Sequence, residues 1–191
     1  MKGRQLNIRD IVLCAMFIAL ITVGAFIKIP IPNMPFTLQF LFTNLAGIIL
    51  GANLGALSVL IYVIAGLIGI PVFTTGGGPG YIFYPTFGFL VGFIIGTYVS
   101  GKFLEKRELT AKNIFIASII NLLIVYALGM IHYYFISNFY SDSPIGIGAL
   151  FLYCFVLAVP GDLLLCFLSS VVGKKVNSAI SKIYYRGVSY E

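Results

Sequence analysis

Charged residues are scarce in this chain. Lys, Arg, Asp and Glu together make up 9% of its 191 residues, whereas 60% of the residues are hydrophobic. Soluble domains carry roughly 25% charged residues, so this composition excludes a water-soluble fold. We predict an all-α membrane protein, because the length accommodates about six spanning helices of about 20 residues each.

The residues that build catalytic and metal centres are also few. The chain has no tryptophan, a single histidine (His132) and three cysteines that lie apart within apolar runs. One histidine cannot form a zinc site, and the sequence shows no Ser/His/Asp or Cys/His set. We therefore predict no metal, no cofactor and no enzymatic activity, since an intramembrane enzyme would need more reactive groups than His132 and scattered tyrosines.

The sequence has no recognisable nucleotide site. The segment Gly96-Thr-Tyr-Val-Ser-Gly101-Lys102 imitates a phosphate-binding loop, but Phe103 stands where Ser or Thr is required, and no strand precedes it. Any energy from ATP must therefore come from a partner protein. No folded basic face is expected that could bind nucleic acid.

The positions of the charges predict the topology. Of the 18 charged residues, 15 fall in three clusters: the N-terminus, residues 102–112 and the C-terminal segment from Lys174. Basic clusters stay on the cytoplasmic side of a membrane. We therefore expect the N- and C-termini and the 102–112 loop to be cytoplasmic, and the loops after the first, third and fifth spans to face outward. The exceptions to the clustering are Lys28, Asp142 and Asp162.

Hydropathy predicts a single integral membrane domain over residues 1–191. The expected spans cover about residues 11–29, 36–52, 54–70, 85–104, 114–137 and 146–173, with a break at 160–161 in the last. A short turn around Asn53 separates the second span from the third. The proline-rich segment from Ile29 to Pro35 predicts a stiff, extended loop.

Asp162 is the only charged residue within the 28-residue run 146–173. A charge inside a membrane is costly, so it marks a functional site by default. It follows Pro160-Gly161, and proline is tolerated in the first turn of a helix. We expect a short apolar helix or re-entrant stretch over 146–158 and a new helix from Pro160. Capping of backbone N–H groups is the alternative role for Asp162, and both roles can coexist.

Small residues recur at four-residue spacing in three of the predicted spans. This spacing places them on one helix face, where backbones can approach closely. For the glycines within 47–55 and 88–96 we expect packing inside the protein. For Ala15 and Ala19, docking to another membrane protein is a second interpretation.

The loop over residues 69–80 is rich in glycine. Gly76, Gly77 and Gly78 permit positive φ angles and close approach of the backbone to a ligand, and the rings of Tyr81 and Tyr84 follow. A glycine loop without a basic residue does not suit a phosphate. It suits a neutral ligand, or it serves only as a flexible outer connection.

Several of these segments, taken in order, resemble one family. The motifs are Met34-Pro35-Phe36-Thr37-Leu38-Gln39, Gly69-Ile70-Pro71-Val72-Phe73, Pro85-Thr86-Phe87-Gly88-Phe89 and Pro160-Gly161-Asp162, together with Ala15-x-x-x-Ala19. Over most of its length the chain resembles the BioY-type substrate-binding subunits of energy-coupling-factor (ECF) vitamin transporters, which are specific for biotin.

The resemblance implies a six-span protein of the bacterial plasma membrane that captures biotin from outside. It implies that the subunit docks through Ala15 and Ala19 on a transmembrane coupling protein, and that two cytoplasmic ATPases drive release inward. Asp162 would accept a ureido N–H of the ligand. The expected ligand-binding residues are Asp162, Gly161, Thr37, Gln39, Gly76, Gly77, Gly78, Tyr81, Tyr84 and His132.

Two positions near the expected site depart from the family pattern. The family often has a lysine where this chain has Leu165, and a tryptophan where His132 stands. A related apolar acid such as lipoate is therefore a second candidate ligand, and Lys28 is the only basic residue on the expected outer side. A stand-alone membrane facilitator is the other alternative, although a pore should show more polar residues along its helices.

Overall fold

The computed structural model describes residues 7–29, 35–141 and 143–188, with side chains through Ala179. Residues 30–34 of the expected extended loop, and Asp142, lie outside the described residues. The fold is mostly helical, as predicted. Its elements are α1 (Ile8–Phe26), β1 (Lys28–Ile29), β2 (Phe36–Thr37), α2 (Gln39–Leu67), the 3-10 helix η1 (Pro79–Phe83), α3 (Phe87–Leu104), α4 (Ala111–Phe139), α5 (Ile147–Phe151), the π-helix η2 (Leu152–Val156) and α6 (Val159–Val188).

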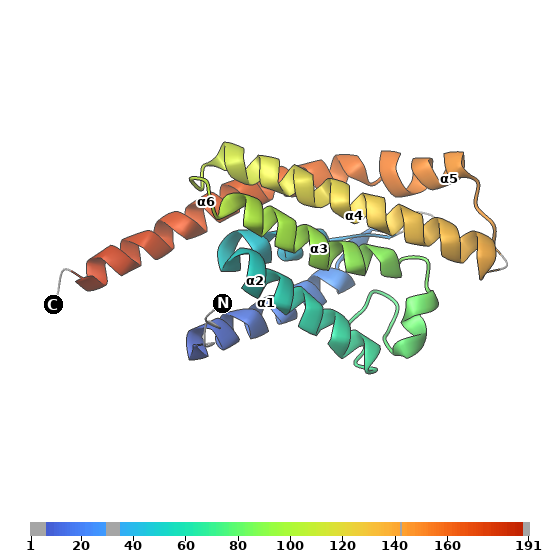
Figure 1. Ribbon diagram of the computed structural model, residues 1–191, viewed down its shortest axis with the longest axis horizontal. Helices are drawn as coiled ribbons and strands as arrows, with labels where there is room; N and C mark the ends of the chain where they lie inside the picture. The colour runs from blue at the N-terminus through green and yellow to red at the C-terminus, as the bar shows by residue number, and fades with distance from the viewer. Residues whose placement is uncertain (1–6, 30–34, 142, 189–191) are drawn as a thin grey trace.

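The long helices run roughly along the long axis of the molecule (Figure 1). Among the residues that the structure describes, five helical stretches are long and apolar enough to cross a membrane, judged by length and composition: α1, α2, α3, α4 and the segment Ile147–Ala179. The start of α1, the connection from α3 to α4 and the end of α6 lie at the same end of the bundle. Two of the three charged clusters, in the α3–α4 connection and from Lys174, therefore lie together.

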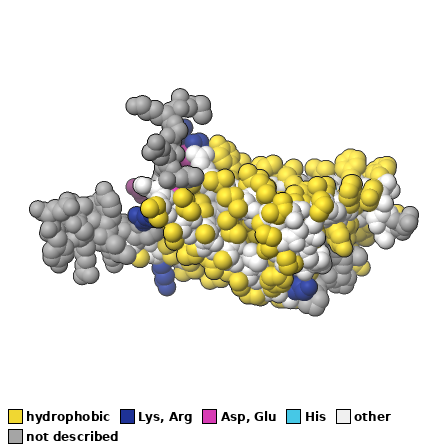
Figure 2. Space-filling view, turned by 90° about the horizontal axis from the view of Figure 1, so that it is seen from below, with side chains coloured by type: hydrophobic (Ala, Val, Ile, Leu, Met, Phe, Trp, Pro, Cys, Tyr) yellow, Lys and Arg dark blue, Asp and Glu magenta, His cyan; other side chains and the backbone are white. Residues whose placement is uncertain are grey.

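The outer surface is largely hydrophobic. Figure 2 shows hydrophobic side chains along the length of the visible face, with most of the visible charged side chains near one end. Large apolar side chains such as Leu123, Phe135 and Phe167 are exposed on the helices. Such a surface is unfavourable in water and matches the hydrocarbon core of a membrane.

Helix α2 is interrupted at Gly51. The backbone there has φ 81° and ψ −179°, a conformation that essentially only glycine adopts. The two arms of α2 fold back on each other at this point. They lie so close that an added Cβ at Gly55 would be 2.8 Å from the carbonyl oxygen of Ala46. The predicted turn around Asn53 is wrong by two residues, since glycine rather than asparagine supplies the conformation that reverses the chain.

Glycines allow α3 to pack closely against α4. An added Cβ at Gly92 would lie 2.8 Å from the Cα of Val125, and one at Gly88 would overlap the side chain of His132. Gly96 is equally tight against the side chain of Asn121. Packing inside the protein, as predicted for the glycines of this span, is confirmed.

A buried polar cluster joins α2, α3 and α4. Asn44 donates to Ser118 (2.7 Å), Asn121 donates to Asn44 (3.1 Å), and Thr97 donates to the carbonyl oxygen of Thr43 (3.1 Å). All five residues are fully buried. Such bonds between membrane helices contribute about 0.6 kcal/mol each on average, so the cluster contributes more to the mutual alignment of the helices than to stability.

The long apolar run that holds Asp162 is not one straight helix. The chain passes from α5 into η2, and a turn at Leu157 and Ala158 interrupts the regular helix before α6 begins. This interruption lies just before the predicted break at 160–161. Pro160 falls in the first turn of α6, where its missing N–H costs no hydrogen bond, and Asp162 lies in the same turn.

The variant Gly51→Ala is expected to destabilise the fold. Alanine in this backbone conformation is strained by about 1–3 kcal/mol, although no other group crowds the position. Gly146→Ala is the matched control, because Gly146 has an ordinary φ of −72° and open space around it. Thermal unfolding in detergent should show a lower Tm for Gly51→Ala only; equal Tm values would show that the turn tolerates a side chain.

Candidate functional site

A cavity of about 270 Å³ lies between β2, the loop before α3 and the helices α2, α3, α4 and α6. This volume is near the lower end for pockets that hold small molecules. Aromatic rings form much of the wall: Phe36, Phe40, Phe73, Tyr81, Tyr84, Phe89, Phe93, Tyr126 and Tyr133. Polar groups are contributed by Thr37, Gln39, Thr74, Thr75, Thr86 and Asp162.

Gln39 joins the elements on one side of the cavity. Its amide nitrogen donates to the hydroxyl of Tyr62 (2.7 Å), and its side-chain oxygen accepts from Thr37 (3.3 Å) and Thr74 (3.4 Å). Tyr62 donates in turn to the carbonyl oxygen of Val72 (2.8 Å). These bonds hold β2, α2 and the following loop together, so the polar groups of this wall are fixed in place.

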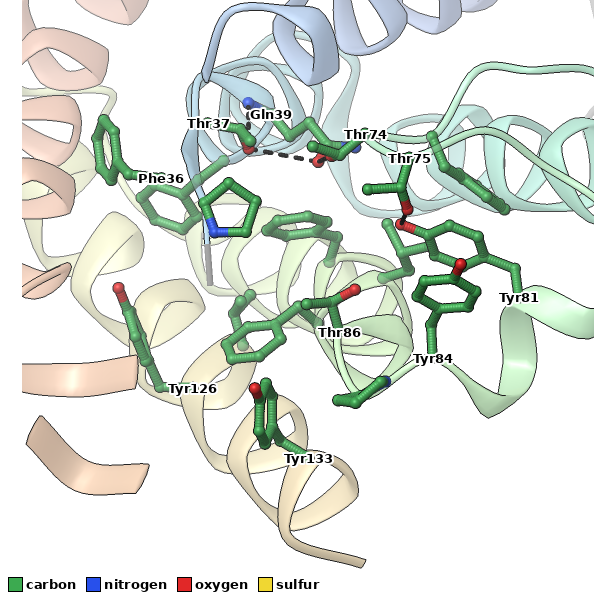
Figure 3. A pocket seen from close by; sticks show the side chains of 18 of the residues that line it. Phe36, Thr37, Gln39, Thr74, Thr75, Tyr81, Tyr84, Thr86, Tyr126 and Tyr133 are labelled. Atoms are coloured by element: carbon green, nitrogen blue, oxygen red, sulfur yellow. Dashed lines mark hydrogen bonds between the residues drawn. The ribbon is translucent and has the colours of Figure 1, made fainter. Parts of the chain in front are cut away.

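Aromatic rings in close contact form the wall beside the Gln39 hydrogen bonds. The ring centroids of Phe73 and Tyr81 lie 4.4 Å apart, and Tyr81 stacks on Tyr84 at 4.9 Å. Thr75 donates to the Tyr81 hydroxyl (3.3 Å). Figure 3 shows Tyr81 and Tyr84 on one side of the cavity and Tyr126 on the other. The cavity therefore offers flat apolar surfaces for a ring system, with polar groups at its edges.

Asp162 is the single charged side chain among the described residues that line the cavity. It is 7% exposed, and its carboxylate accepts a hydrogen bond of 2.5 Å from the Tyr126 hydroxyl. Tyr126 is itself 2% exposed and lies edge-on to Phe89 and Phe155, at 6.0 and 5.5 Å between centroids. A bond this short is typical of a charge-assisted pair, and it offsets part of the cost of burying a carboxylate.

The same carboxylate can bind a ligand. The two oxygens of a carboxylate offer about four acceptor positions, and the hydrogen bond from Tyr126 uses one of them. N–H donors of a ligand therefore fit this end of the cavity. The arrangement suits a small, largely apolar ligand that contains a ring system and directs N–H groups toward Asp162.

Five of the residues predicted to bind a ligand line this cavity, and a sixth lies directly behind its wall. The five are Thr37, Gln39, Tyr81, Tyr84 and Asp162. The sixth is Gly161, where an added Cβ would lie 2.7 Å from the ring of Phe36. Glycine at this position therefore lets α6 approach β2 closely.

The glycines at 76–78 are not among the lining residues of the described cavity. The backbone N–H at position 78 donates to the carbonyl oxygen of Gly66 (2.7 Å), and the backbone at position 76 exchanges two hydrogen bonds with Phe73. The loop is thus closed by its own backbone contacts. Its neighbours Thr74 and Thr75 line the cavity instead.

His132 also lies outside the lining of the described cavity. Its Nδ1 is 3.3 Å from the carbonyl oxygen of Pro85, and its ring lies near that of Phe87, with centroids 5.8 Å apart. Pro85 does line the cavity. His132 therefore supports the wall from behind at the start of α3.

Ala15 and Ala19 lie on the exposed face of α1. The larger side chains of Ile11, Val12 and Met16 on the same helix are exposed as well. The two alanines leave the helix backbone accessible between these larger groups. A helix of another membrane protein could contact α1 closely there.

Sequence reasoning did not identify Tyr126, Thr74 or Thr75. Tyr126 lies 36 residues before Asp162, and no motif or spacing links the two. The available signal was a phenol hydroxyl inside a predicted span, which needs a hydrogen-bond partner when it is buried. Among the described residues, no group of three or more His, Cys, Asp or Glu side chains is arranged to hold a metal ion.

Residues 1–182 match the BioY family. A protein of Lysinibacillus sphaericus named "Probable biotin transporter BioY" is 40% identical over 174 residues, which cover 91% of this chain and 89% of the relative. "Biotin transporter BioY" of Thermotoga maritima is 43% identical over 133 residues, or 69% of this chain and 76% of the relative. Both relatives are named as transporters and not as enzymes.

A solved structure has a similar fold. It is described as the S-component for biotin from an ECF-type ABC transporter, and it matches with a TM-score of 0.77 at 25% sequence identity. The match covers 93% of this chain and 95% of the solved chain. Together with the apolar helices, these similarities identify the chain as a multi-pass membrane protein.

The variant Tyr126→Phe is expected to destabilise the protein. It removes the hydroxyl that donates to Asp162 and leaves a buried carboxylate short of one donor, which costs about 1–3 kcal/mol. Tyr140→Phe is the matched control, because Tyr140 is exposed and loses only a solvent-facing hydroxyl. Thermal unfolding in detergent should show a clear drop in Tm for Tyr126→Phe alone, and similar Tm values for the two variants would contradict this role.

Proposed function

Because the chain belongs to the BioY family, we propose that it is the substrate-binding subunit of an ECF-type transporter and that its cavity binds biotin. The names of its relatives and the description of the related structure support this assignment. The observation in this molecule that carries the proposal is the buried carboxylate of Asp162 at one end of a ring-lined cavity.

The functional groups of biotin match the groups that line the cavity. Its ureido ring carries two N–H donors, its bicyclic body is apolar, and its tail ends in a carboxylate. Asp162 accepts a ureido N–H in a charge-assisted hydrogen bond. The aromatic wall encloses the bicyclic body, and the hydroxyl and amide groups of Thr37 and Gln39 supply further polar contacts.

In this proposal, partner proteins supply the energy for transport. In the proposed assembly, Ala15 and Ala19 dock on a transmembrane coupling protein, and two cytoplasmic ATPases drive release of biotin inward. The exposure of both alanines on α1 supports this surface. The description of the related structure as part of an ECF-type ABC transporter supports this kind of partner.

The proposed topology has six passes, with both termini in the cytoplasm. The chain reversal at Gly51 supports counting the two arms of α2 as separate passes. The gathering of the α3–α4 connection and the start of α1 at one end supports the orientation, because basic segments stay on the cytoplasmic side.

Equilibrium binding to the purified protein in detergent tests the function directly. We expect biotin to bind more tightly than lipoate, because lipoate has no ureido N–H groups to donate to Asp162. Tighter binding of lipoate would change the ligand while keeping the transporter role. Binding of neither ligand to folded protein would refute the proposed function.

The variant Asp162→Asn is expected to weaken biotin binding by about 1–3 kcal/mol, or roughly 5- to 150-fold in Kd. The reason is that the neutral amide loses the charge-assisted acceptor while it can still accept the hydrogen bond from Tyr126. Glu108→Gln, a change at an exposed acid in the α3–α4 connection, is the control for lost negative charge. Unchanged affinity in folded Asp162→Asn protein would assign Asp162 to structure alone.

The variants Ala15→Trp and Ala19→Trp are expected to abolish uptake in cells that contain the partner proteins, while biotin binding to the purified subunit stays intact. A bulky ring on the exposed face of α1 blocks a close helix contact. Leu123→Trp, on the exposed face of α4, is the control for a ring that faces lipid. Loss of binding in both alanine variants would show that these positions serve internal structure.

A further inference from the structure

Lys28 lies at the rim of the cavity. It belongs to β1, which pairs antiparallel with β2 so that Lys28 stands opposite Thr37. Directly opposed residues of an antiparallel pair direct their side chains to the same face. Because Thr37 lines the cavity, Lys28 projects from the ribbon toward the cavity side.

A hydrogen bond places the ammonium group of Lys28 independently. Its Nζ donates to the carbonyl oxygen of Thr74 at 3.3 Å, and Thr74 lines the cavity. An ammonium group has three N–H donors, and this contact uses one of them. Lys28 itself is exposed, so its charge lies at the mouth of the cavity rather than inside it.

The negative charge of Asp162 and the positive charge of Lys28 therefore lie toward opposite sides of the cavity. Figure 3 shows Tyr126, which donates to Asp162, on one side of the cavity and Thr74 and Thr75 on the other. A ligand carboxylate is repelled by Asp162 and attracted by Lys28. No Lys or Arg is among the described residues that line the cavity, and Lys28 lies beside it through its contact with Thr74.

We infer that Lys28 binds the carboxylate of the ligand at the mouth of the cavity, and that Lys28 and Asp162 together set the direction in which the ligand enters. This inference rests on the proposed function. It identifies a residue that selects acidic ligands over neutral analogues of the same shape. An ionised carboxylate is a stronger acceptor than the neutral carbonyl of Thr74, so the ammonium group gains a better partner when the ligand binds.

The test compares biotin with biotinamide, which has the same ring system and a neutral amide in place of the carboxylate. Equilibrium binding is measured for the full chain in detergent, as wild type and as Lys28→Gln, Lys28→Arg and Lys112→Gln. Lys112→Gln is the matched control, because it removes one exposed positive charge from the start of α4, far from this contact in the sequence.

Lys28→Gln should weaken biotin binding about three- to tenfold, a modest effect because the ammonium group is exposed, and should change biotinamide binding by less than about twofold. Lys28→Arg should retain most of the preference for biotin, and Lys112→Gln should bind as wild type does. The preference of the wild type for biotin over biotinamide should also shrink as salt is raised.

The outcomes separate this inference from the function on which it rests. If the wild type binds biotin but Lys28→Gln leaves the affinity for biotin unchanged, or weakens the binding of biotin and biotinamide equally, Lys28 does not bind the ligand carboxylate. If folded wild-type protein binds neither biotin nor biotinamide, the proposed function fails and the role of Lys28 fails with it.

Discussion

The cost of keeping a carboxylate inside an apolar bundle governs the architecture around Asp162. The first turn of α6 holds the residue, Tyr126 of α4 donates to it, and Phe89 and Phe155 hold Tyr126 in place. Each of these contacts comes from a different part of the chain. The helices must therefore pack as they do for the carboxylate to be tolerated, and a carboxylate so placed can still accept donors from a ligand.

Two of the helices that line the cavity begin or bend at irregular points of the chain. Gly51 reverses α2, and the interruption at Leu157 and Ala158 starts α6 anew beside the cavity. Glycine-mediated contacts then bring the backbones together around these irregular points, as at Gly161 against Phe36. The cavity thus lies within the helix bundle itself, between elements from distant parts of the chain, rather than in a separate binding domain.

Sequence reasoning drew attention to residues whose signal is local. Asp162 was found because it is one charge in a long apolar run, and five of the ten predicted ligand-binding residues line one cavity. For the glycine loop, the sequence did not indicate that its backbone groups bond within the loop and to Gly66. The presence of glycines shows that unusual backbone angles are possible, but it does not show which backbone N–H and carbonyl groups those angles bring together.

The sequence by itself determined the membrane setting, the helical class, the clustering of basic residues and the position of the buried acid, because hydropathy, charge and helix-breaking residues act over short stretches of chain. Only the tertiary structure decided that Tyr126 pairs with Asp162 and that Lys28 meets Thr74. These partners lie 36 and 46 residues apart in the chain. Contacts over such separations depend on how helices and loops pack in space, and no periodicity or local motif encodes that packing.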